Sequence, residues 1–263
     1  MEKDIKVPIL AEEVAQGRSP EYLYWVGCAG SYDARAQKVT RAFVKLLNQA
    51  EVDFAVLGDE EQCTGDPARR AGNEFVFQML AQQNIALLNG YGVQKIIVTC
   101  PHCYNALNND YSELGGQYEV THYATFLQEL LSSGKLKTQS KSDKTITYHD
   151  SCYLGRGNGI YEDPRSVVQH LFNEISEMER SREKGLCCGA GGAQMFKEDE
   201  PGKRRINEER AHEIRATSAE IVVANCPFCL TMLEDGLKVE DTEKKVMVYD
   251  LSELILKNQK MEV

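Results

Sequence analysis

The sequence predicts an α/β protein made of two tandem, pseudo-symmetric domains, each with a small, mostly parallel sheet and flanking helices. The first observation behind this prediction is a regular alternation of short apolar segments, typical of buried strands, with longer segments of helical spacing. The second is a repeat, because cysteines recur in the same order in both halves of the 263-residue chain, at offsets of 124 to 126 residues. The repeat predicts an N-terminal arm at 1–21, a first domain at 22–131, a linker at 132–144 and a second domain at 145–258.

In the first half, three apolar segments are expected to be strands, and each leads to a cysteine. They are "YLYWVG" (22–27) before Cys28, "DFAVLG" (53–58) before Cys63, and "KIIVTC", which ends on Cys100. Helices are expected over 33–49, where apolar residues recur at helical spacing, and over 72–90, which stops at Asn89-Gly90. A further helix is expected from Pro101, since proline suits the first helical turn.

The second half repeats this order with "TITYHDSC", "EIVVANC" and a helix from Pro227. The flanks of the repeat also agree, since "IIVTCPHCYNAL" corresponds to "IVVANCPFCLTML" and "YEVTHYATFLQELL" corresponds to "VMVYDLSELIL". Most of the cysteines therefore lie at the carboxyl ends of strands or on the loops that follow them. Open α/β sheets bind ligands at that edge, so a ligand site is expected in each domain.

Composition and charge narrow the class of protein. Hydrophobic residues make up 42% of the chain, which is enough for a packed core, and the net charge of −10 disfavours nucleic acid or an anionic membrane surface as a partner. The sequence shows neither a signal-peptide pattern at its start nor an apolar run of membrane-spanning length, which indicates a cytoplasmic protein. In a reducing compartment, nine cysteines indicate metal binding or redox chemistry rather than disulfides.

The motif C-x-x-C occurs twice, and by itself it suits a dithiol redox pair, a zinc site or an iron–sulfur site. Each copy is preceded by further cysteines, which a simple redox pair would not need. The candidate ligands are Cys28, Cys63, Cys100 and Cys103 in the first half, and Cys152, Cys187, Cys188, Cys226 and Cys229 in the second half.

The five cysteines of the second half exceed the four ligands of a tetrahedral zinc ion or of a cubane [4Fe–4S] cluster. The adjacent thiolates of Cys187 and Cys188 can instead reach neighbouring irons of one enlarged cluster. Gly189 and the other glycines around them let the backbone approach closely and offer N–H groups to sulfides.

In these residues the chain resembles the cysteine-rich CCG domain proteins, whose pattern is C-x(31–39)-C-C-x(35–39)-C-x-x-C. The second half fits in full, with 34 residues between Cys152 and Cys187 and 37 residues between Cys188 and Cys226. The segments "CTGDPARRAGNE" and "LCCGAGGAQMF" are similar to a subgroup that forms the C-terminal part of iron–sulfur oxidoreductases linked to electron-transfer flavoproteins. In the B subunit of heterodisulfide reductase each full motif binds a noncubane [4Fe–4S] cluster, and the resemblance implies the same for the second half.

The first half departs from the family pattern. Gln62 stands where the second half has Cys187, so that only Cys63 remains of the adjacent pair. For this half the resemblance implies a conventional [4Fe–4S] cluster, a modified noncubane cluster or a zinc ion held by four thiolates.

The resemblance implies an iron–sulfur electron-transfer subunit of an oxidoreductase complex. It would pass electrons between a flavoprotein or a ferredoxin-like, two-cluster iron–sulfur partner and a quinone-linked acceptor, and it would reach the inner face of a membrane through a partner. The alternatives are a catalytic heterodisulfide or thiol–disulfide reductase subunit and a subunit of a lactate or glycolate oxidation system. A chain that bound zinc alone would be a structural module.

Three residues are expected to support the ligands. His149, in "YHDSC", can donate a hydrogen bond to a cluster sulfur or relay protons, although a histidine satisfied by backbone at a strand end is the alternative. His102 lies between two candidate ligands, and Gly189 follows the adjacent cysteines. The run "KRRINEER" (203–210) is expected to form a solvated helix face.

Overall fold

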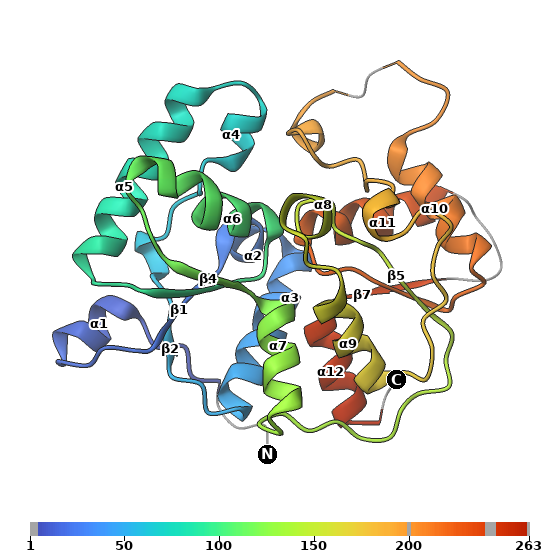
Figure 1. The fold of residues 1–263 in the computed structure, drawn as a ribbon, viewed down its shortest axis with the longest axis horizontal. Coiled ribbons are helices and arrows are strands. Elements are labelled where there is room, and N and C mark those ends of the chain that lie inside the picture. The colour runs from blue at the N-terminus through green and yellow to red at the C-terminus, as the bar shows by residue number, and fades with distance from the viewer. Residues whose placement is uncertain (1–4, 199–200, 240–245, 262–263) are drawn as a thin grey trace. The chain divides into compact units, whose positions relative to one another are not determined.

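The computed structural model describes residues 5–198, 201–239 and 246–261, and the chain divides into two compact units, Met1–Leu136 and Lys137–Val263. Each unit has a parallel sheet flanked by helices (Figure 1), so the predicted fold class is confirmed. Residues 1–4 of the expected N-terminal arm, and residues 199–200 and 240–245 of the expected second domain, lie outside the described residues.

The first unit contains a four-stranded sheet in the order β2-β1-β3-β4, and every neighbouring pair is parallel. Its helices and strands are α1 (Leu10–Ala15), β1 (Tyr22–Trp25), α2 (Gly27–Tyr32), α3 (Ala34–Gln49), β2 (Phe54–Ala55), α4 (Asp66–Arg70), α5 (Glu74–Gly90), β3 (Lys95–Val98), α6 (Pro101–Asn105), β4 (Glu119–His122) and α7 (Tyr123–Ser132). The aromatic ring of Phe43 on α3 contacts those of Tyr24 on β1 and Tyr123 on α7 edge to face, at 5.1 and 5.5 Å between centroids. These contacts pack α3 and α7 on one face of the sheet.

The two long helices of the first unit begin where polar side chains satisfy the free N–H groups of the first turn. The Asp33 carboxylate accepts from the N–H of Ala36 at 2.7 Å, and the Asn73 side chain accepts from the N–H of Val76 at 3.2 Å. Both helices predicted from the sequence are therefore confirmed, with starts one or two residues later than expected.

The N-terminal segment packs along the edge strand of the first sheet. The N–H of Leu10 donates to the carbonyl of Val56 at 2.8 Å, and the N–H of Val56 donates to the carbonyl of Pro8 at 2.9 Å. The strand expected over 53–58 thus splits its pairing, since only Phe54–Ala55 pairs with β1 while Val56 pairs with this segment.

The second unit contains a three-stranded parallel sheet in the order β5-β6-β7. Its helices and strands are β5 (Ile146–Tyr148), α8 (Gly155–Asn158), α9 (Glu162–Leu171), α10 (Ile206–Ala216), β6 (Ile221–Val223), α11 (Pro227–Val239), β7 (Met247–Tyr249) and α12 (Leu251–Gln259). A single parallel bridge between Ile146 and Ile175 occupies the place that β2 has beside β1 in the first sheet. The two sheets therefore share one strand order, as the cysteine repeat predicts.

The helix that contains the end of "KRRINEER" is not a purely solvated one. Asn207 and Arg210 on α10 are 1% and 0% exposed, and the Asn207 side chain donates to the carbonyl of Met232 on α11. The expectation of a solvated face is therefore wrong for these two residues, because α10 packs against α11 and buries its polar positions.

Candidate functional site

The cysteines of the first half gather at the carboxyl edge of the first sheet. β1 and β3 are adjacent and in register, with Trp25 opposite Val98, so the segments that follow them start at the same edge. Cys28 lies in α2 just after β1, while Cys100 precedes α6 and Cys103 lies in its first turn. Gly27 has a φ of +77°, and a Cβ there would lie 3.4 Å from the Cys103 sulfur, so the two loops approach closely.

The cysteines of the second half gather in the same way after β5 and β6. The sulfurs of Cys152 and Cys187 are 4.0 Å apart. One ring nitrogen of His149 and the sulfurs of Cys188 and Cys229 all lie within 4.8 Å of one another. Among the described residues, this buried group has the spacing of metal ligands, and it includes both a cysteine of the adjacent pair and one of the C-x-x-C motif.

Hydrogen bonds between thiols shift the thiol pKa values in the same directions in both halves. A hydrogen bond to Cys63 raises the pKa of the Cys28 thiol, and the same contact lowers the pKa of Cys63 to about 6. Likewise, hydrogen bonding between the thiols raises the pKa of Cys152 and lowers that of Cys187. Each half thus has one cysteine whose thiol pKa is lowered, and the thiolate is the form that binds metals.

Backbone N–H groups support these two sulfurs. The N–H of Gly189 donates to the Cys187 sulfur at 3.3 Å, and the N–H of Gly65 donates to the Cys63 sulfur at 3.4 Å. Both glycines are in the left-handed region, with φ of +94° and +84°. This conformation is readily available to glycine because it has no Cβ.

His149 is held by a buried arginine that the sequence analysis missed. The Nε of Arg210 donates to Nδ1 of His149 at 3.0 Å, and burial together with Arg210 lowers the pKa of His149 to about 3. Because arginine only donates, Nδ1 is an acceptor and the ring proton is on Nε2. A run of charges on a helix gave no sign that one member would turn inward, and only the packing of α10 reveals it.

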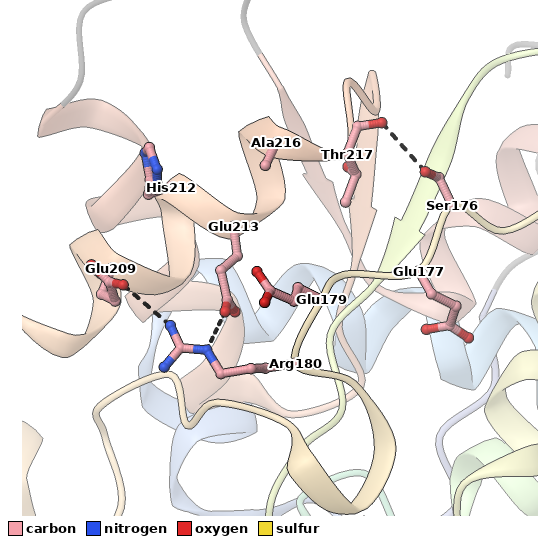
Figure 2. Close-up of a pocket in the computed structure, with 9 residues that line it drawn as sticks. All are labelled: Ser176, Glu177, Glu179, Arg180, Glu209, His212, Glu213, Ala216 and Thr217. Carbon is pink, nitrogen blue, oxygen red and sulfur yellow. Dashed lines mark hydrogen bonds and ion pairs between the residues drawn. The ribbon is translucent and has the colours of Figure 1, made fainter.

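The same arginine connects His149 to a surface pocket of about 710 Å³ that is lined by residues of α10 and of the segment 176–180. Arg210 also contacts the Glu213 carboxylate and donates to the carbonyl of Arg180 at 2.8 Å. Figure 2 shows the Arg180 guanidinium reaching Glu209 and Glu213 at one side of this pocket. An ion-pair network therefore joins the buried histidine to the pocket lining.

Two ring nitrogens near the start of the cysteine motifs are buried without a hydrogen-bond partner among the described residues. They are Nε2 of His149 and Nε1 of Trp25, whose side chains are 0% and 1% exposed. Both stand three residues before the first cysteine of their half, Cys28 or Cys152. An unpaired buried N–H is costly, so the His149 ring, which lies within 4.8 Å of the Cys188 and Cys229 sulfurs, fits a site that holds an anionic, sulfur-rich group.

Carboxylates join the cysteine loops in each half. Glu61 accepts from the N–H of Val26 at 2.9 Å and from that of Gly27, and burial raises its pKa to about 7 despite these bonds. In the second half Asp150 accepts from the N–H of Arg182 at 2.7 Å and forms a bidentate pair with the buried Arg165, at 2.7 and 2.9 Å.

The residues between the C-x-x-C cysteines have different neighbours. His102 lies with Nδ1 2.8 Å from the Asp66 carboxylate, which also accepts from Arg70. The corresponding Phe228 contacts Phe196 at 6.2 Å between ring centroids. The first half therefore has a charged network at this position, whereas the second half has an aromatic cover.

A family model described as a cysteine-rich domain, CCG, matches residues 22–108 and again 146–234. The chain belongs to the cysteine-rich (CCG) domain family. The two matches confirm the resemblance and the duplication inferred from the cysteine spacing. Among the described residues, every helix is too short or too polar to cross a membrane.

Curated relatives match nearly the whole chain. It is 47% identical over 247 residues to EtfAB:quinone oxidoreductase of Syntrophomonas wolfei, covering 92% of this chain and 35% of that protein. It is 46% identical over 253 residues to the probable iron-sulfur-binding oxidoreductase FadF of Bacillus subtilis, covering 96% and 36%. It is 35% identical over 243 residues to the D subunit of dihydromethanophenazine:CoB--CoM heterodisulfide reductase from Methanosarcina barkeri, covering 89% and 58%.

The chain spans about a third of the length of the first two of these relatives and 58% of the third. Among solved structures, a hypothetical protein from Helicobacter pylori is similar with a TM-score of 0.57 and 11% identity, over 90% of this chain and 48% of that one. At this identity the similarity supports the fold alone.

Proposed function

We propose that this chain is the iron–sulfur electron-transfer part of an oxidoreductase, with a metal group in each half. The observation that carries the proposal is the gathering of nine cysteines into two sets, each at the carboxyl edge of a parallel sheet. Cysteine thiolates are the ligands of iron–sulfur clusters. The names of the relatives support the same chemistry, since one is an iron-sulfur-binding oxidoreductase and another is a quinone oxidoreductase.

In the second half we propose a noncubane [4Fe–4S] cluster, because five cysteines exceed what a cubane cluster or a zinc ion needs. The residues that would hold it are Cys152, Cys187, Cys188, Cys226 and Cys229. In the first half we propose a second [4Fe–4S] cluster, with a zinc ion as the alternative. The residues that would hold it are Cys28, Cys63, Cys100 and Cys103.

When bound, such a cluster supplies a one-electron carrier whose potential depends on charge, burial and N–H···S bonds. The residues of the chain set these conditions. Cys188, Cys226 and Cys229 are at most 3% exposed, so water is kept from their sulfurs. The N–H groups of Gly189 and His149 would point donors at the sulfur-rich group, and His102 would add a polar contact beside the first set.

Electrons would enter from a flavoprotein or a ferredoxin-like iron–sulfur partner and leave, one at a time, toward a quinone-linked acceptor. The relative named EtfAB:quinone oxidoreductase motivates both ends of this route. A quinone acceptor lies in a membrane, so we propose that a partner brings the chain to the inner membrane face. The net charge of −10 supports protein partners over nucleic acid.

The test is anaerobic purification of the full chain, with iron, sulfide and zinc measured per chain and EPR spectra of the oxidised and reduced protein. Iron near eight per chain would indicate clusters in both halves, and about four with one zinc would assign zinc to the first half. A signal that Cys187→Ser removes would support the second-half cluster. Zinc without iron in strictly anaerobic protein would contradict the proposal and leave a structural module.

A second candidate is a catalytic part of a heterodisulfide reductase, which the similarity to the D subunit of such an enzyme favours. Reduction of one disulfide by two electrons and two protons yields two thiols. The iron-loaded chain with a reduced electron donor and a disulfide substrate would release thiols under this hypothesis. Under the electron-transfer proposal, quinone analogues would be reduced and disulfides would not.

A further inference from the structure

The position that lacks a cysteine in the first half can be located in two ways. An offset of 125 residues pairs Cys63 with Cys188 and leaves Gln62 opposite Cys187. The offset of 124 residues, which relates Cys28 to Cys152, instead pairs Cys63 with Cys187 and places Thr64 opposite Cys188. Sequence spacing alone favours neither alignment.

Backbone hydrogen bonds support the second alignment. The Cys63 sulfur accepts from the N–H of Gly65 at 3.4 Å, and the Cys187 sulfur accepts from the N–H of Gly189 at 3.3 Å. Both glycines have left-handed backbone conformations. In each half, the sulfur therefore lies two residues before a left-handed glycine, and Cys63 corresponds to Cys187.

The thiol partners agree with this correspondence. Cys63 is hydrogen-bonded to Cys28, which is the first cysteine of its half. The Cys187 sulfur lies 4.0 Å from that of Cys152, which is the first cysteine of the second half. Corresponding sulfurs therefore join corresponding loops in the two halves.

Thr64 takes the structural place of Cys188. Both are buried, at 1% and 3% exposed, and each lies against the last cysteine of its half. The Thr64 hydroxyl donates to the Cys103 sulfur at 3.9 Å, while Cys188 lies within the 4.8 Å group that contains Cys229. Gln62, in contrast, is exposed.

We propose that Thr64, and not Gln62, replaces the fifth thiolate of the first half, and that its hydroxyl restricts that half to a group held by four thiolates. This inference rests on the proposed function and names the residue that makes the two sites different. A threonine hydroxyl remains protonated where a cysteine would be a thiolate, so it donates a hydrogen bond to the Cys103 sulfur and adds no ligand charge.

The first experiment compares Thr64→Cys with the matched control Gln62→Cys in anaerobically purified, iron-loaded full chain. Thr64→Cys completes the motif, so the EPR signal that Cys187→Ser removes should show about a twofold rise in spins per chain. Gln62→Cys should leave that signal unchanged. A rise in Gln62→Cys without a rise in Thr64→Cys would overturn the inference.

The reciprocal variant Cys188→Thr should convert the signal of the second half into that of the first half while iron remains bound. This variant tests the inference even if Thr64→Cys fails to fold. Retention of the original second-half signal in Cys188→Thr would contradict the equivalence of the two positions.

A metal-free readout separates this inference from the proposed function. Mild oxidation and peptide mass spectrometry of the chelated chain should find a disulfide to Cys103 in Thr64→Cys and none in Gln62→Cys. If the wild-type chain bound no iron, the proposed function would fail, yet this disulfide would still report the geometry. A disulfide to Cys103 from position 62 alone would overturn the inference.

Discussion

Each half buries a ring N–H three residues before its first cysteine, but the side chain that provides it differs. Trp25 and His149 stand at corresponding positions, and an indole N–H can only donate. An imidazole donates through Nε2 only if Nδ1 accepts, and Arg210 on α10 enforces this state. A donor that one side chain provides by itself in the first half therefore depends on a buried ion network in the second half.

The carboxylate that links the two cysteine loops of each half, called the joint below, also differs between the halves. In the first half Glu61, on the loop of Cys63, accepts from the N–H groups of Val26 and Gly27. In the second half Asp150, at the position of Val26, accepts from the opposite loop at Arg182. The carboxylate therefore lies on a different loop in each half, but it links the two cysteine loops in both. Arg165 neutralises the buried charge only in the second half.

The largest loss of stability should come from breaking the buried Arg165–Asp150 ion pair of the second half. Arg165→Met leaves Asp150 buried without its cation, which should destabilise the chain by about 3–5 kcal/mol. Urea unfolding followed by far-UV circular dichroism measures the change. The control Arg182→Met removes a pair with the exposed Glu162 and should cost less than about 1 kcal/mol. Equal losses in both variants would contradict the assigned joint.

The next effect should come from the corresponding joint of the first half. Glu61→Gln weakens the bonds from Val26 and Gly27, because an amide oxygen accepts less strongly than a carboxylate, and should cost about 1–3 kcal/mol. Trp25 is the single tryptophan of the chain, so its fluorescence reports the first unit in urea. Asp59→Asn, a neighbouring exposed carboxylate, is the control. A larger shift for Asp59→Asn would mean that the joint lies elsewhere.

Much of the fold was predictable because its signals are local. The apolar segments that became β1, β3 and β6 are each bounded by a cysteine loop, and the helix starts carry Asp33 and Asn73 as caps. The repeat predicts two similar domains, and the two sheets share one strand order. The sequence also places the nine candidate ligands at strand ends, which parallel pairing brings to one edge, and their binding of a metal group stays a prediction.

The rest was not predictable because it depends on contacts across the sequence. Arg210 is 61 residues from His149 and lies in a run that resembles a solvated face, so only the packing of α10 against α11 shows that it turns inward. The choice between Gln62 and Thr64 depends on contacts such as the hydrogen bonds from Gly65 to the Cys63 sulfur and from Thr64 to the Cys103 sulfur. The spacing of the cysteines does not decide between two alignments that differ by one residue.

A smaller effect should come from the ring N–H groups themselves. If each donates to a bound cluster, then His149→Phe and Trp25→Phe remove a bond that favours the reduced, more negative state. The midpoint potential of the corresponding half should fall, by about 59 mV for a tenfold change in a one-electron equilibrium. Potentiometric titration with EPR detection measures this shift. His212→Phe, an exposed position on the same helix as Arg210, should leave both potentials unchanged.

The smallest effect should come from Gln62, the residue that the offset of 125 residues places opposite Cys187. Gln62 is exposed, so Gln62→Ala should change the free energy of unfolding by no more than about 0.5 kcal/mol. Thr64→Val removes a buried hydroxyl that donates to the Cys103 sulfur and should cost about 0.5–1.5 kcal/mol. Trp25 fluorescence in urea measures both variants in the same unit. If Gln62→Ala proved the more destabilising, then Gln62 would be the buried partner of the first site, and the correspondence of Thr64 with Cys188 would be wrong.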